Sequence, residues 1–191
     1  MLVLASTSLS RKAMLEAAGV LFEPVAPMVD EEAAKDAMSH LSPRDLADAL
    51  AELKAARISA KRPGQIVLGC DSVGDLDGIR MDKPGEALAD QLRLISGRTH
   101  KLHSAAVAYL DGQPVWRVIE TATLHVRPLS EAFIADYVAR DPEAQWCAGG
   151  YRIEGLGAQL FERVEGSWFA IMGLPLLPLL SWLRMRGVLA S

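Results

Sequence analysis

The first eleven residues of the chain combine residue types that bind anions. An apolar stretch, Leu2 to Ala5, has the composition of a short strand and runs directly into Ser6-Thr7-Ser8-Leu9-Ser10-Arg11. A helical pattern of apolar residues follows at once. A strand that ends in a hydroxyl-rich turn and opens a helix points several backbone N–H groups at one spot. Helix capping alone explains one hydroxyl but not a series of them followed by arginine, so we predict a phosphate site here.

Asp71 is a second candidate for chemistry, because it follows the predicted buried strand Gln65 to Gly69. Ligands of open α/β sheets bind at the carboxyl ends of strands, where the hydroxyl-rich turn is also expected. Asp71 could simply form a turn or cap the next segment. A carboxylate that faces a phosphate site could instead hold Mg²⁺, which takes one or two carboxylates together with substrate phosphates and water. We favour the metal-binding role.

Three further charged residues could serve the same chemistry. Glu31 lies in an acidic run, residues 30–32, that also fits the first turn of a helix. Lys54 falls on a predicted helix, where most lysines are simply solvated. Lys83 precedes Pro84, whose fixed φ defines the loop from which the ammonium group projects. Each of these signals is weak in isolation.

The elements that must position these residues alternate between strand and helix. The predicted strands cover 2–5, 21–25, 65–69, 100–110 and 115–126, with a small hairpin at 75–80. The predicted helices follow the opening turn and cover 43–60, 86–95, 130–139 and 174–186. Long adjacent strands imply antiparallel pairing within this alternation. We therefore expect an α/β fold in which helices flank a mixed twisted sheet, as a single domain over residues 1–191.

The composition narrows the class of protein further. Half of the 191 residues are hydrophobic, which is enough for a sizeable core, and the formal charge of −4 argues against a broad nucleic-acid surface. No apolar run is long enough to span a membrane, and the apolar opening lacks the pattern of a signal peptide. Cys70 and Cys147 suggest neither a disulfide framework nor a zinc site. We expect a cytoplasmic protein with reduced thiols.

Several short segments together resemble one family. Leu4-Ala5-Ser6-Thr7-Ser8, followed by Arg11, looks like the opening signature of the Maf-like nucleoside triphosphate pyrophosphatases. Further matches occur in the family's order along nearly the whole chain. They are Val29-Asp30-Glu31, Leu50-Ala51 with Lys54-Ala55, Gly69-Cys70-Asp71, Lys83-Pro84, Ser96-Gly97, Cys147-Ala148-Gly149, Glu154-Gly155-Leu156-Gly157 and Gly173-Leu174-Pro175-Leu176.

This resemblance implies a Maf/inosine-triphosphatase-like fold with two lobes around a central cleft. It also implies a homodimeric house-cleaning hydrolase that cleaves a nucleoside triphosphate between the α- and β-phosphates, with Mg²⁺ or Mn²⁺ as cofactor. The implied site residues fall into three groups. Asp71 is the proton acceptor beside Lys54 and Lys83, Ser6 and Arg11 bind phosphate, and Glu31 and Asp71 hold the metal. These residue types suit the reaction, since cations offset charge on the leaving pyrophosphate.

The family's subgroups differ in the nucleobase, and the positions held to separate them fall on Ser10, Ser72 and Glu154. The resemblance implies that Glu154 matches the 7-methyl-GTP subgroup, and the chemistry agrees, since a carboxylate accepts the neighbouring N–H donors of guanine. Trp168 or Tyr151 could stack on the cationic methylated ring. Ser10 and Ser72 match neither subgroup. A dTTP/UTP pyrophosphatase therefore stays open, as does a non-catalytic nucleotide-binding regulator of septum formation.

Overall fold

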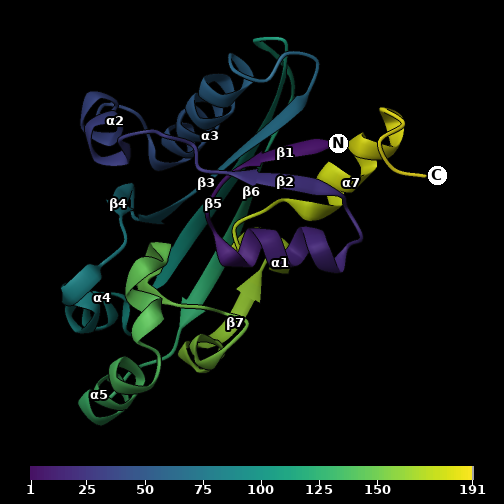
Figure 1. Ribbon diagram of the computed structural model, residues 1–191. Helices are drawn as coiled ribbons and strands as arrows, with labels where there is room; N and C mark the ends of the chain where they lie inside the picture. The colour runs from purple at the N-terminus through teal and green to yellow at the C-terminus, as the bar shows by residue number, and fades with distance from the viewer. Residues whose placement is uncertain (191) are drawn as a thin grey trace.

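A mixed seven-stranded sheet forms the centre of the computed structural model, which describes residues 1–190 (Figure 1). Its order is β2-β1-β3-β5-β6-β7, with β4 paired to β3. Only β1 pairs in parallel, with β2 on one side and β3 on the other. The strands are β1 (Leu2–Ala5), β2 (Phe22–Val25), β3 (Ile66–Leu76), β4 (Ile79–Met81), β5 (Thr99–Leu110), β6 (Gln113–Val126) and β7 (Phe161–Glu165). The predicted α/β class with a mixed sheet is confirmed.

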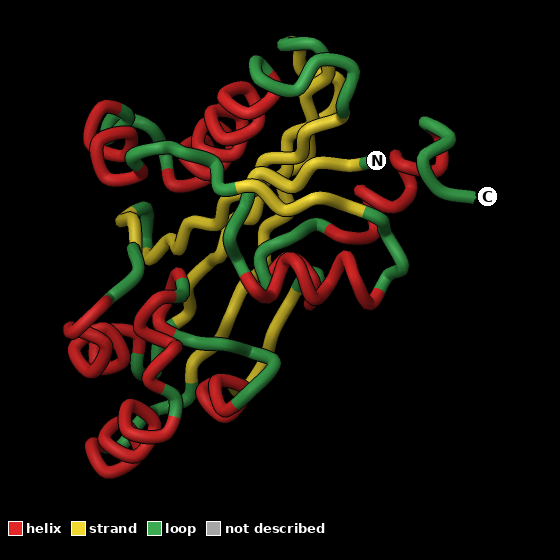
Figure 2. Tube along the Cα trace, viewed as in Figure 1, coloured by secondary structure: helices red, strands yellow, loops and turns green. Residues whose placement is uncertain are grey.

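Helices pack around this sheet in separate groups, as Figure 2 shows in red. Figure 1 places α2 and α3 toward one end of the sheet and α4 and α5 toward the other, with α1 between them. The helices are α1 (Leu9–Ala17), α2 (Glu31–Ala37), α3 (Pro43–Ser59), α4 (Leu88–Ile95), α5 (Glu131–Arg140), α6 (Trp168–Ile171) and α7 (Leu176–Met185). Short 3-10 turns cover Gly85–Ala87, Pro142–Trp146, Ala148–Gly150 and Leu156–Leu160.

The longest helix, α3, follows from its local sequence. Ser42 caps it by accepting a hydrogen bond from the backbone N–H of Asp45, and Pro43 occupies its first turn. Its apolar stripe is buried against the sheet. At Gly69 the helix backbone comes so close to β3 that a Cβ atom would lie 2.1 Å from the carbonyl oxygen of Ala51. Only glycine therefore permits this approach of helix and strand.

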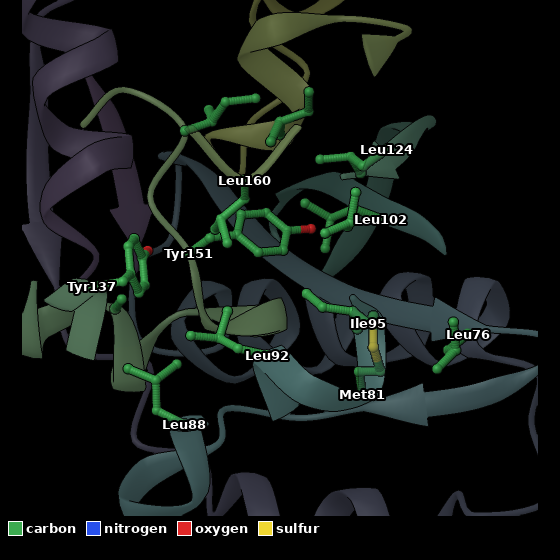
Figure 3. Close-up of a cluster of buried hydrophobic side chains, with 14 of the residues drawn as sticks. Leu76, Met81, Leu88, Leu92, Ile95, Leu102, Leu124, Tyr137, Tyr151 and Leu160 are labelled. Atoms are coloured by element: carbon green, nitrogen blue, oxygen red, sulfur yellow. The ribbon is translucent and has the colours of Figure 1, made fainter. Parts of the chain in front are cut away.

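Separate hydrophobic clusters stabilise the two ends of the sheet. One contains the buried side chains shown in Figure 3, including Leu92, Leu102 and Tyr151, which come from α4, β5 and the segment after α5. Another packs β1, α1 and α7 together and includes Leu4, Leu15 and other apolar side chains of these elements. Burial of large apolar side chains contributes about 1.5–3 kcal/mol each.

The structure corrects the predicted elements at several points. Strand β3 does not end at Gly69 but continues to Leu76, because β5 and β4 supply antiparallel partners for its second half. Asp71 therefore lies within a strand instead of following one. The elements α2, α6 and β7 were not predicted as such, although Glu31 does begin a helix, capped by Asp30.

Candidate active site

One cleft of about 390 Å³ brings together nearly all the residues predicted from the sequence. Strand β1 ends at Ala5, beside Gly69 of β3, so the chain leaves the sheet next to the position of Asp71. The cleft is lined by these predicted site residues among others: Ser6, Ser10, Arg11, Glu31, Lys54, Asp71, Ser72, Lys83 and Glu154. They come from the turn before α1, from α1, α2, α3 and β3, and from the loops after β4 and α5.

Arg11 is a buried cation that has only neutral partners. Its side chain belongs to a residue that is 9% exposed. Its Nε donates to the carbonyl oxygen of Gly173 at 2.7 Å, and its two Nη atoms donate to Ser6 Oγ and Ser72 Oγ, each at 3.3 Å. Among residues 1–190 no carboxylate lies within ion-pair distance of this guanidinium. Because a buried charge without a counterion is costly, the geometry favours an anion in the cleft.

Two donors of Arg11 remain for such an anion. An arginine side chain has five N–H groups, and three of them are used in these contacts. The hydroxyl of Ser6 is similarly prepared, because it accepts from Arg11 and from the backbone N–H of Ser8. Its own hydrogen is then free to donate. Arg11 and Ser6 therefore present N–H and O–H donors of the kind that phosphate oxygens accept.

Lys54, Asp71 and Glu31 form the ionic centre of the cleft. Lys54 Nζ lies 2.6 Å from Asp71 Oδ1 and 2.8 Å from Glu31 Oε1, and the lysine is 4% exposed. Lys83 Nζ approaches the other oxygen of Glu31 at 3.7 Å. Partial burial alone would raise the pKa of Glu31, but the ammonium groups of Lys54, Lys83 and Lys35 outweigh it and hold that pKa below its ordinary value.

The same carboxylates could hold a divalent cation. Asp71 and Glu31 contact one ammonium group, so their oxygens converge on a small volume. Among residues 1–190 no cluster of three or more carboxylate, histidine or cysteine ligands exists. Two carboxylates completed by substrate phosphates and water are what Mg²⁺ commonly takes, so the donor set fits. Within the described chain, Asp71 Oδ2 has no hydrogen-bond partner.

The three predicted specificity positions separate into two places. Ser10 donates a hydrogen bond to Glu154 Oε1 at 3.2 Å, which joins the first turn of α1 to the loop after α5. Ser72 instead accepts from Arg11 and lies 2.8 Å from the hydroxyl of Ser104. Ser10 and Glu154 therefore form one pair, while Ser72 belongs to the surroundings of the guanidinium.

Of the two aromatic residues named from the sequence as stacking partners for a base, one lines the cleft and the other does not. Trp168 was expected to stack on a base, but it lines a separate shallow hollow beside β7. Tyr151 does line the cleft, yet it is buried and its hydroxyl is 2.8 Å from His100 Nε2. Trp146 lines the cleft and is 59% exposed. In the sequence, Trp146 is one of four tryptophans and lies eight positions before Glu154, and no other signal marks it.

Two further observations concern the cysteines and the helices of residues 1–190. Cys70 and Cys147 form no disulfide. Burial raises the pKa of the Cys70 thiol to about 11, so it is not a reactive thiolate at neutral pH. In the described part of the chain, no helix has both the length and the apolar composition to cross a bilayer.

Comparison with known proteins agrees with this geometry. Residues 1–186 match the family described as Maf-like protein. A nucleoside triphosphate pyrophosphatase of Sphingopyxis alaskensis is 52% identical over 98% of each chain, and one of Caulobacter vibrioides is 49% identical over 97% of this chain and 96% of its own.

A solved structure, a HAM1 protein from Coxiella burnetii, is similar at a TM-score of 0.40 and 16% identity, over 65% of this chain and 72% of that one. The family match and the two relatives extend over nearly the full length, cleft residues included. The chain belongs to the Maf-like protein family.

Proposed function

We propose that this chain hydrolyses a nucleoside triphosphate at the α–β phosphoanhydride bond and releases the monophosphate and pyrophosphate. The observation that carries the proposal is the buried, carboxylate-free guanidinium of Arg11 in the same cleft as the Lys54–Asp71 pair. The first is suited to a phosphate chain and the second to proton transfer beside it. The names of the two relatives describe the same activity.

The reaction assigns a distinct task to each side chain. Asp71 Oδ2, which faces no donor in residues 1–190, takes the proton of the water that attacks the α-phosphorus. As the new P–O bond forms, the bond from the α-phosphorus to the bridging oxygen breaks, and its electron pair leaves with pyrophosphate. Lys54 and Lys83, which both contact Glu31, offset that negative charge. Arg11 and Ser6 hold the phosphate oxygens in place.

A divalent cation, Mg²⁺ or Mn²⁺, is proposed as cofactor, held by Glu31 and Asp71. When bound, such a cation neutralises phosphate charge and lowers the pKa of water. Lys54 lies between the two carboxylates and holds them close together.

For the base we propose 7-methylguanine, in 7-methyl-GTP. The Ser10 hydroxyl fixes one oxygen of Glu154 and leaves the other to accept from the guanine edge. The exposed ring of Trp146 in the same cleft offers a face on which a cationic purine could stack. Thymine and uracil present one N–H between two carbonyl oxygens. A carboxylate would repel these carbonyl oxygens.

A substrate panel with product identification tests both parts. The protein is incubated with 7-methyl-GTP, GTP, UTP and dTTP, and pyrophosphate and orthophosphate are quantified. We expect pyrophosphate as the product and the highest kcat/KM for 7-methyl-GTP. Orthophosphate as the only phosphate product would contradict the bond assigned. A preference for UTP or dTTP over both purines would contradict the role of Glu154 and support the pyrimidine alternative.

The homodimer and the cytoplasmic location stay predictions. The proposed chemistry uses side chains of a single chain.

A further inference from the structure

A fully buried serine lies directly behind the phosphate-binding part of the cleft. Ser104 of β5 is paired with Ser72 of β3 in the antiparallel register, and their hydroxyl oxygens are 2.8 Å apart. Ser104 also donates to the carbonyl oxygen of Ala170, in α6, at 2.6 Å. It does not line the cleft, and the reaction proposed above gives it no task.

The directions of these hydrogen bonds can be worked out from the number of hydrogens. A serine hydroxyl has one hydrogen, and a carbonyl oxygen can only accept. Ser104 therefore spends its hydrogen on Ala170, so Ser72 must donate to Ser104. The Ser72 oxygen is then left to accept from Arg11 Nη2. These hydrogen bonds form a relay in which each group donates to the next, from Arg11 through Ser72 and Ser104 to the carbonyl oxygen of Ala170.

The segment that ends this relay also holds the other side of the guanidinium. Arg11 Nε donates to the carbonyl oxygen of Gly173, three residues beyond Ala170. The backbone at Gly173 has a φ of +100°, and a Cβ there would lie 3.3 Å from Arg11 Nε and 3.4 Å from Ser72 Oγ. The residues that follow α6 thus pack closely against the guanidinium, which is held by hydrogen bonds on both sides.

We propose that Ser104 is a positioning residue for phosphate binding. By holding the hydroxyl of Ser72 as an acceptor, it fixes the plane of Arg11, so that the two unused N–H groups face the phosphate chain. This inference rests on the proposed function, in which Arg11 binds phosphate. It also moves Ser72 from base selection to phosphate binding, because its only hydrogen is already donated to Ser104.

Binding of inorganic pyrophosphate, measured by titration calorimetry on the full chain, tests the relay without requiring turnover. Ser104→Ala and Ser72→Ala are each expected to weaken binding about five- to tenfold, the usual size for one hydrogen bond. Because Ser104 acts through Ser72, the double variant should bind no more weakly than Ser72→Ala alone. If the two serines contributed independently, the fold losses of affinity in the single variants would instead multiply in the double variant.

A matched control separates positioning from loss of stability. Ser59 is also a buried serine, and it is the last residue of α3. Its hydroxyl accepts a hydrogen bond from the backbone N–H of Gly112. Ser59→Ala removes a comparable hydrogen bond and should leave pyrophosphate affinity unchanged. If Ser104→Ala fails to fold, Ser104→Cys is the second variant, because its slightly larger thiol forms weaker hydrogen bonds and the same loss of affinity is expected.

The outcomes against the proposal are distinct. Wild-type affinity in a folded Ser104 variant, or a double variant whose loss equals the product of the single losses, would overturn the relay. A wild-type protein that releases no pyrophosphate from any nucleoside triphosphate would overturn the proposed function instead. In that case the pyrophosphate titrations would still decide whether Ser104 positions Arg11.

Discussion

At the scale of single residues, the two cations of the cleft differ in their partners. Lys54 is paired with two carboxylates, whereas Arg11 contacts only hydroxyl and carbonyl oxygens. The charge of Lys54 is therefore largely balanced inside the protein. That of Arg11 is balanced only when an anion enters. This difference separates a residue that organises the acid–base centre from one that binds the substrate's phosphates.

Asp71→Asn tests the proton acceptor. The amide keeps the size of the side chain but cannot take a proton, so kcat for pyrophosphate release should fall by about 10²- to 10⁴-fold. Nucleotide binding by calorimetry should persist, because the contacts of Arg11 are untouched. Asp75→Asn is the matched control, since Asp75 lies on the same strand, bonded to His103 outside the cleft. Undiminished turnover in Asp71→Asn would show that another group accepts the proton.

Residue types, together with the resemblance of short segments to one family, were enough to predict side chains that share the cleft, from Ser6 to Glu154. Their partners could not be predicted, because hydrogen bonds such as Ser10 to Glu154 join positions 144 residues apart. Trp146 was missed for a related reason. Nothing in its neighbouring residues distinguishes a tryptophan at a cleft from one in a core, and only the folded loop exposes it.

At the scale of elements, the contact between α3 and β3 positions the acid–base centre. Gly69→Ala would place a Cβ 2.1 Å from the carbonyl oxygen of Ala51 and 2.6 Å from the backbone nitrogen of Ala55. Since both atoms belong to helix backbone, α3 must shift and carry Lys54 away from Asp71. Overpacking of this kind should lower the unfolding free energy by about 3 kcal/mol, which urea denaturation would measure. Turnover should fall as well, because Lys54 is displaced.

Gly19→Ala is the control for that change. Gly19 has a φ of +69°, and no heavy atom lies within 4 Å of the place that a Cβ would occupy. Only backbone strain of about 1 kcal/mol is therefore expected, with normal turnover. Equal stability losses in the two variants would show that the close approach of α3 to β3 is not what Gly69 provides.

The elements themselves were predicted well where the periodic pattern is long. The helix expected over 43–60 is observed as Pro43–Ser59, and the strands expected over 100–110 and 115–126 are observed as β5 and β6. The hairpin expected over 75–80 is observed as the end of β3 paired with β4, whereas residues 71–74 were missed because glycine and aspartate disfavour a strand locally. Antiparallel pairing with β5, together with the Asp75–His103 contact, outweighs that preference.

At the scale of the whole molecule, one buried histidine couples the fold to pH. His100 is buried beside Tyr151, whose ring is labelled in Figure 3, and among residues 1–190 its buried Nδ1 has no hydrogen-bond partner. Burial lowers the pKa of His100 from 6.5 to about 4. The folded protein thus holds this imidazole neutral at a pH where the unfolded chain would protonate it.

The sign of the effect on stability follows from proton binding. Between pH 6.5 and about 4 the unfolded state binds more protons at His100 than the folded state, so the unfolding free energy falls as the pH falls. A shift of this size corresponds to about 3 kcal/mol. In His100→Gln this contribution is absent, so the loss of unfolding free energy between pH 7 and pH 4.5 should be smaller than in the wild type. His40→Gln, at an exposed position, is the matched control for the loss of a histidine side chain. Parallel profiles for the wild type and His100→Gln would show that His100 is not the group whose burial makes the fold acid-sensitive.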